Sequence, residues 1–142
     1  MHSQETTDHG GQPFVADIEA LTTNNQTFRT AVWTGAYLQM TLMSIEPGGE
    51  VGLEVHDDHD QFLRIESGSA TVVMGPAKDD LPLQADAGVD FAILVPAGTW
   101  HNIINEGDEP LKLYSIYAPG EHPFGTVHAT AAEAQAAEGH DQ

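Results

Sequence analysis

The sequence predicts an all-β domain, either an antiparallel sandwich or a small barrel. Short apolar runs follow one another from residue 28 onward, and each is broken by glycine, proline, asparagine or aspartate. Spacing of this kind is typical of antiparallel strands joined by tight turns. The 142 residues suit one domain. Neither a Rossmann nor a P-loop glycine pattern interrupts the series.

The elements are expected in the following order. Residues 15–21 can form one or two helical turns. Strands are then expected over residues 28–34, 37–45, 50–56, 61–67, 70–75, 82–85, 90–95, 100–105 and 111–118. Thr130-Ala-Ala-Glu133 matches a capping box, which opens an alanine-rich helix that runs to Glu138 and stops at Gly139.

Three segments follow from this order. Residues 1–12 are expected to be a disordered polar tail, residues 13–120 a single β-barrel domain, and residues 121–142 a loop with a short helix. The tail has neither a positive start nor an apolar stretch, so it does not resemble a secretory signal. No run approaches the ~20 apolar residues that span a membrane. We therefore expect a cytoplasmic protein with no membrane partner.

The charge balance restricts the partners further. The chain has 22 acidic and 4 basic residues, a formal net charge of −18, and no cysteine. Nucleic-acid binding needs clustered Lys and Arg, so we expect no nucleic-acid partner. A surface this acidic suggests a halophilic or high-salt source. Disulfides are excluded by composition.

Metal-capable side chains gather around one predicted hairpin. Glu54 and His56 are two residues apart and therefore share a face of their strand. An acidic turn reverses the chain, and Gln61 opens the next strand, where cross-strand neighbours approach within ~5 Å. His101 comes early in the strand that follows the turn Pro96-Ala-Gly98. These four side chains could converge on one ion.

At these residues the sequence resembles the cupin family. The first family motif places a glycine, a His-x-His pair, a glutamate and a glycine where this chain has Gly48, Glu54, His56, Gln61 and Gly68. The second motif corresponds to Asp90, Pro96, Gly98, His101 and Asn105. The resemblance spans residues 37–118 and implies a double-stranded β-helix, the cupin jelly-roll barrel, with short N-terminal and C-terminal helical segments. The strings GLEVH, DQFLRIE, PAGTWHN, LKLYSIYAP and GTVH look like small single-domain cupins of the phosphomannose-isomerase-like type.

The resemblance implies one divalent metal ion held by Glu54, His56, Gln61 and His101. Three positions depart from the family pattern: Glu54 replaces a histidine, Gln61 a glutamate and Asp90 a glycine. Two imidazoles with a carboxylate and an amide oxygen suit iron, manganese or zinc, and nickel is also compatible. Gln61 either binds the ion or orients a water on it, and Glu54, if displaced from the ion, serves as a catalytic base.

Three further histidines are candidates for substrate binding. His59 lies in the turn before Gln61, and we expect that turn to direct it outward, at the rim of the pocket. His122 and His128 flank the segment 123–127 after the last strand. That segment either folds over the barrel mouth, where it can supply a proton-transfer group, or is a surface loop.

Strand alternation also assigns residues to the outer face. Arg64 points opposite to Gln61, which weakens a phosphosugar interpretation because phosphates favour Arg or Lys clamps. Trp100 points opposite to His101, and an outward Trp100 and Phe62 would suit a homodimer of the kind that cupin relatives form.

Three functions remain open. The first is a metal-dependent enzyme, an isomerase or lyase or a dioxygenase, that acts on a small oxygenated metabolite, sugar-like or a carboxylate. The second is a non-catalytic cupin that binds or senses a small molecule. The third is a purely structural metal site.

Overall fold

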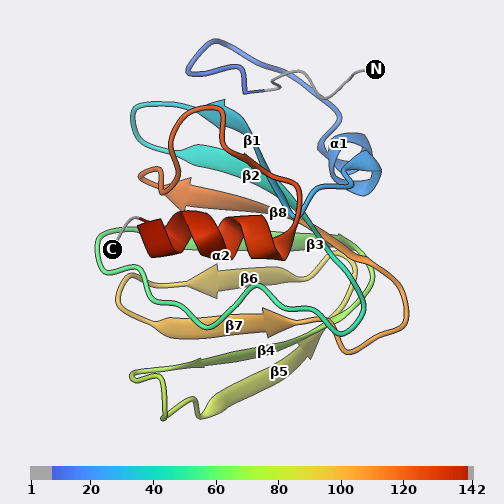
Figure 1. The fold of residues 1–142 in the computed structure, drawn as a ribbon, viewed down its shortest axis with the longest axis vertical. Coiled ribbons are helices and arrows are strands. Elements are labelled where there is room, and N and C mark those ends of the chain that lie inside the picture. Colours follow the sequence, from blue (N-terminus) through green and yellow to red (C-terminus); the bar gives the residue numbers. More distant parts are fainter. Residues whose placement is uncertain (1–7, 141–142) are drawn as a thin grey trace.

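The computed structural model describes residues 8–140, with side chains through residue 137, and confirms the all-β class (Figure 1). A six-stranded antiparallel sheet has the order β6-β3-β8-β2-β1-β9, and a three-stranded sheet has the order β5-β4-β7. The strands are β1 (Arg29–Thr34), β2 (Gln39–Ile45), β3 (Asp60–Ser67), β4 (Ala70–Gly75), β5 (Leu83–Ala87), β6 (Ala92–Val95), β7 (Trp100–Ile104), β8 (Leu111–Ala118) and β9 (Val127–His128). One hydrophobic core joins the two sheets.

The strand expected over residues 50–56 does not form. This segment runs beside β7 as a coil in Figure 1 and meets it only through isolated bridges, Glu50 with Ile104 and Glu54 with His101. Gly52 has φ +109°, outside the strand region, so a regular ladder cannot continue through it. Its N–H donates instead to Oδ1 of Asn102, at 2.9 Å.

The two helices form near their expected positions. α1 spans Ile18–Asn24, three residues later than predicted, because the Asp17 carboxylate caps it by accepting from the Ala20 N–H. α2 spans Ala131–His140, so the helix runs one residue past Gly139. The Oγ1 of Thr130 accepts from the Glu133 N–H, as in a capping box, whereas the Glu133 carboxylate accepts from the Ala129 N–H, one residue before the N-cap.

Part of the segment predicted to be a disordered tail makes hydrogen bonds, within residues 8–12, whereas residues 1–7 lie outside the described part of the chain and the tail stays a prediction. Asp8 is buried. Its carboxylate accepts from the Thr34 hydroxyl and the Gly125 N–H, both at 2.7 Å. The His9 N–H also donates to the carbonyl of Val32. Polar composition does not separate a mobile tail from a segment held by side-chain hydrogen bonds.

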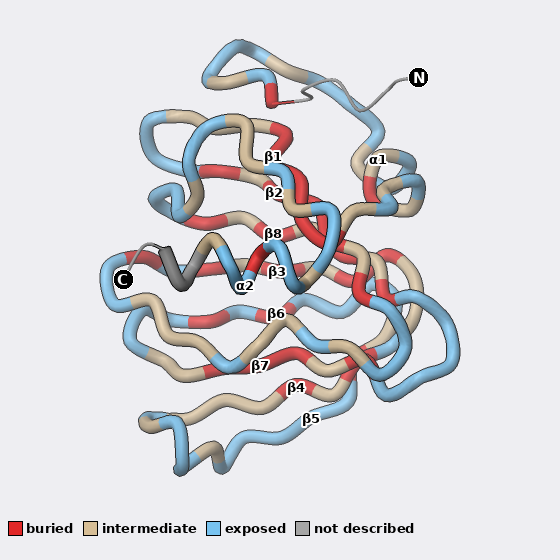
Figure 2. Tube along the Cα trace, viewed as in Figure 1, coloured by how far each residue is buried: buried red, intermediate tan, exposed pale blue. Residues whose placement is uncertain are grey.

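Buried residues are spread along the strands (Figure 2), and the buried face changes character along its length. Towards one end it is apolar, and we call this region the apolar half: Met43, Ile45, Leu63, Ile65, Ile103, Leu111 and Leu113. Towards the other end the same strands bury polar residues, which we call the polar half: Gln39, Thr41, Gln61, His101, Ser115 and Tyr117. The register aligns these residues across the sheet, with Tyr117 opposite both Gln39 and Gln61.

Asp90 adopts the backbone conformation of the glycine that it replaces. Its φ is +75°, the one positive φ of a non-glycine residue within 8–140. Aspartate tolerates this left-handed region better than most residues do. Its Oδ1 accepts a hydrogen bond from Nη2 of Arg64 at 2.7 Å. Arg64 therefore lies on the outer face, as strand alternation predicts.

Candidate metal centre

Glu54 and His101 are neighbours because segment 50–56 runs antiparallel to β7. The backbone N–H of each residue donates to the carbonyl of the other, at 3.0 and 2.9 Å. Residues paired in this way present their side chains on the same face. The Nε2 of His101 consequently lies 3.6 Å from Oε2 of Glu54.

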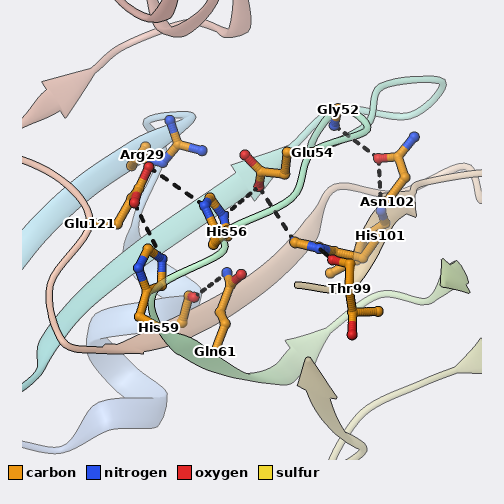
Figure 3. A network of polar contacts seen from close by, with 12 residues as sticks. Arg29, Gly52, Glu54, His56, His59, Gln61, Thr99, His101, Asn102 and Glu121 are labelled. Atoms are coloured by element: carbon orange, nitrogen blue, oxygen red, sulfur yellow. Dashed lines mark hydrogen bonds and ion pairs between the residues drawn. The ribbon is translucent and has the colours of Figure 1, made fainter. Parts of the chain in front are cut away.

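His56 joins the same pair of side chains. Its Nε2 lies 3.5 Å from the same Glu54 Oε2. Its carbonyl accepts from the Gly98 N–H at 2.7 Å, which ties it to the turn before β7. The ligand atoms of Glu54, His56 and His101 all lie within 4.8 Å of one another, as Figure 3 illustrates. Three of the four predicted ligands are therefore brought together.

Gln61 reaches the cluster from the second position of β3. Its Nε2 donates to the hydroxyl of Ser115 at 2.8 Å, which fixes the orientation of the amide. Its Oε1 is buried without a hydrogen-bond partner among the described residues. Figure 3 shows the side chain extending from β3 toward His56. The amide oxygen is thus the atom of Gln61 that remains available to a ligand.

The local contacts also fix which nitrogen of His101 faces the cluster. Its Nδ1 lies 3.1 Å from the carbonyl oxygen of Thr99, which can only accept, so Nδ1 carries the proton. In the neutral imidazole, Nε2 is then the nitrogen that can accept a hydrogen bond or bind a metal. Within residues 8–137, neither His101 Nε2 nor Glu54 Oε2 has a hydrogen-bond partner, although both are buried. Buried acceptors without partners are rare in folded proteins.

The donor set fits a divalent transition-metal ion. Two imidazoles, one carboxylate and one amide oxygen are ligands that iron, manganese and zinc accept. Burial alone would raise the pKa of the Glu54 carboxyl. Where His101 and His56 carry a proton on Nε2, their hydrogen bonds and charge outweigh burial and hold that pKa well below its usual value. Glu54 is therefore ionised, the state that binds a cation.

A second layer lies behind His56, and it corrects the prediction for His59. The expectation that the turn directs His59 outward is wrong, because its side chain is only 3% exposed. His59 lies one residue before β3 begins, so strand alternation does not determine its direction. Its Nε2 lies 3.2 Å from one carboxylate oxygen of Glu121, and Nδ1 of His56 lies 3.6 Å from the other.

The loop after β8 returns over the barrel. His122 is half-buried, and its backbone N–H and carbonyl both bond the side chain of Gln39. The rings of His122 and Tyr117 meet edge to face with centroids 5.3 Å apart. His128 lies in β9, opposite Arg29 of β1. The structure thus favours the covering arrangement over a surface loop, and substrate binding by these histidines stays a prediction.

Two residues of this region were missed by sequence reasoning. Glu121 follows the last predicted strand, where periodicity places no side chain, and its one signal is its position next to His122. Arg29 is one of the chain's 4 basic residues and is not among the predicted site residues. Its signal was strand parity, because Arg29 and Ala31 share the inner face of β1 and both are buried.

Comparison with known proteins identifies the family. A family model for the cupin domain matches residues 41–117. The uncharacterized protein YrkC of Bacillus subtilis is 60% identical over 131 residues, which are 92% of this chain and 70% of YrkC. The crystal structure of BH2720 from Bacillus halodurans is 58% identical with a TM-score of 0.91, over 92% of this chain and 98% of that one. A Klebsiella pneumoniae protein with a double-stranded β-helix domain shares the fold at 19% identity and a TM-score of 0.63, over 82% and 98% of the two chains. This chain therefore belongs to the cupin family, and its fold is the double-stranded β-helix that the sequence motifs predicted.

Proposed function

We propose that the chain binds one divalent metal ion through Glu54, His56, Gln61 and His101. The observation that carries this proposal is the convergence of buried acceptor atoms. Oε2 of Glu54, Oε1 of Gln61 and Nε2 of His101 are all buried without hydrogen-bond partners among the described residues. A cation would satisfy these acceptors together, which no protein donor nearby does.

We further propose that this centre serves an enzyme acting on a small oxygenated metabolite. When bound, a metal ion supplies Lewis-acid polarisation of a substrate oxygen or, if it is iron, activation of dioxygen. Thr99 orients His101, and Ser115 orients Gln61. Burial raises the pKa of Tyr117 to about 12, so its phenol stays protonated beside His56. The narrower likeness to phosphomannose-isomerase-like cupins stays a prediction.

The test is elemental analysis of protein purified without an affinity tag, compared with two variants. Wild type is expected to hold about one equivalent of a divalent metal. His101→Ala is expected to weaken metal binding more than tenfold, because it removes a ligand on a fixed strand. His9→Asn is the matched control, since His9 stacks on Phe14 far along the chain from the cluster. Equal metal content in wild type and His101→Ala would refute the proposed ligands.

Turnover separates an enzyme from a binding module. An enzyme converts a candidate substrate at a rate that falls in His101→Ala and returns with one particular metal. A sensing or storage cupin would bind the same compound and release it unchanged. A structural ion would be held by protein ligands alone, and no small molecule would alter its spectrum.

A further inference from the structure

Arg29 is a buried cation without an acidic partner. It is the first residue of β1 and is 1% exposed. No carboxylate oxygen of the described residues lies within 4.0 Å of its guanidinium, and its Nε has no hydrogen-bond partner among them. Charged side chains are almost never fully buried unless they are paired. Its guanidinium carbon lies 5.3 Å from the centroid of the Phe28 ring, which carries no net charge, so the buried cation still points to a missing anion.

The other basic residues show that Arg29 is exceptional in this chain. Arg64 contacts both Asp90 and Glu66 on the outer face. Lys112 donates to the backbone carbonyl of Asn25. The protein has 22 acidic residues and 4 basic ones, so a carboxylate partner for Arg29 would have been abundant. In so acidic a chain, a buried arginine would be expected to have a carboxylate partner, and Arg29 has none among the described residues.

The neighbours of Arg29 do not neutralise it. Its Nη1 lies 3.2 Å from Nδ1 of His128. Arginine can only donate, so this Nδ1 is an acceptor and carries no proton. Burial, with Arg29 as a second cause, lowers the pKa of His128 and lowers that of His122 to about 3. Both imidazoles are therefore neutral, and the guanidinium keeps its full charge.

A chain of ring contacts connects Arg29 to the metal centre. His128 packs against His122 with centroids 6.3 Å apart. His122 packs against Tyr117 at 5.3 Å, and Tyr117 packs against His56 at 5.9 Å. Figure 3 places Arg29 on the side of the cluster where Glu121 and His56 lie. The cation and the proposed ligands thus belong to one polar interior.

We propose that Arg29 binds the carboxylate of a small organic acid at the metal centre, so that the substrate of this cupin is an organic anion. The proposal has a second part, which rests on the proposed metal function: another oxygen of the same organic acid binds the metal ion. The planar guanidinium matches a carboxylate in shape and in single charge. A phosphate usually needs several cations, and Arg29 is the one basic side chain buried among the described residues.

Binding requires a local movement, because Arg29 is so little exposed. The segment 119–126 joins β8 to β9 and lies over this end of the barrel through the bonds between His122 and Gln39. Gln39 bonds Glu121 and His122, Asp8 bonds Gly125, and the Ala31 N–H donates to the carbonyl of Thr126, so these bonds hold the segment in place. Displacement of this segment would open the guanidinium to the organic acid.

The experiment measures binding of glycolate and of its uncharged analogue ethylene glycol by calorimetry. Both are titrated into metal-free and zinc-loaded protein at one ionic strength held with sodium chloride, because salt alone can stabilise so acidic a chain. Glycolate is expected to bind wild type and ethylene glycol to bind at least tenfold more weakly, since a charged hydrogen bond is lost. Inorganic phosphate serves as a third probe.

Two variants that each remove one positive charge complete the design. Arg29→Met is expected to weaken glycolate binding at least tenfold, and Arg64→Met, on the outer face, to change it less than twofold. Arg29→Met is also expected to unfold at the same temperature as wild type or higher, because it removes an unpaired buried charge. Should it fail to fold, the wild-type titrations still decide.

The outcomes separate this proposal from the metal function. Equal glycolate affinity in Arg29→Met and wild type overturns the role of Arg29, even if zinc binds. Equal affinity of wild type for glycolate and ethylene glycol overturns it as well, and tighter binding of phosphate than of glycolate overturns the carboxylate assignment. Glycolate binding that needs Arg29 in a protein that takes up no metal supports the anion site and refutes the metal centre.

Discussion

The two halves of the barrel interior are built from the same strands but differ in chemistry. In the apolar half, β8 buries Leu111 and Leu113, whereas in the polar half the same face of β8 buries Ser115 and Tyr117. β2 changes in the same way, from Met43 and Ile45 to Gln39 and Thr41, in register with β8. One half therefore stabilises the fold, and the other half holds the polar groups that we assign to function.

The two halves contribute differently to the free energy of unfolding. The apolar half removes hydrocarbon from water, which stabilises the folded state by about 25 cal/mol per Å² of apolar surface. The polar half buries Thr41 Oγ1, Gln61 Oε1 and His101 Nε2 without hydrogen-bond partners among the described residues. Unpaired buried polar atoms cost free energy. Substitutions in the two halves should therefore have very different effects.

The largest expected effect is in the apolar half. Leu113→Ala is expected to lower the free energy of unfolding by about 2–5 kcal/mol, because Leu113 is completely buried and a cavity would remain. Urea denaturation measures the change. Metal content per folded molecule should stay that of wild type. A loss of less than 1 kcal/mol would remove the distinction between the two halves.

The second effect concerns the pH dependence of stability and His122, which packs against Tyr117 of the polar half. Burial and the charge of Arg29 lower the pKa of His122 to about 3, whereas an unfolded histidine titrates near its ordinary pKa of 6.5. Between these values the unfolded chain binds a proton that the folded chain does not, so acid favours unfolding. Stability should be complete above pH 6.5 and fall by about 2 kcal/mol toward pH 5.

Thermal unfolding at pH 7 and pH 5 tests this expectation. His122→Phe should flatten the dependence between these two values, whereas His9→Phe should leave it as in wild type. The Glu54 carboxyl, whose pKa is lowered, loses its contribution only below its unfolded value of 4.5 and stays constant in this window. An unchanged slope in His122→Phe would contradict a neutral, buried His122.

A smaller effect is expected for Thr41→Val. The two side chains have the same shape, and the buried Oγ1 of Thr41 has no hydrogen-bond partner among the described residues. Removing such a hydroxyl should leave the free energy of unfolding unchanged or raise it by up to about 1 kcal/mol. Denaturant midpoints measure it. A loss of more than 2 kcal/mol would show that the hydroxyl is satisfied, and the polar half would then cost less than we infer.

The smallest effect is expected outside both halves. Asp90→Gly relieves the positive φ of +75° but removes the ion pair with Arg64. A glycine at positive φ is favoured by roughly 1 kcal/mol, and an exposed ion pair contributes about 0–1 kcal/mol. The two changes nearly cancel, so the unfolding temperature should move little. A large shift in either direction would show that the outer face contributes to stability as much as the interior does.

Periodicity and motif spacing predicted most of the strands and the cluster of possible metal ligands, but they also predicted a strand over residues 50–56 that does not form and missed β9. Alternation placed Glu54 with His56 and set Arg64 on the outer face, and the structure agrees. It failed where no strand carries the alternation across a turn, as for His59. It also could not find Glu121 or the isolation of Arg29, because these depend on which segments meet in space.

The segment 50–56 has a kinetic consequence. It carries Glu54 and His56, yet it is held to β7 by isolated bridges instead of a continuous ladder. Segments with few backbone bonds open far more often than the whole domain unfolds. Release of a bound ion to solvent should therefore require the opening of segment 50–56 only. The amide hydrogens of residues 50–56 should exchange at rates that follow the rate of metal release, whereas those of β8 should stay protected.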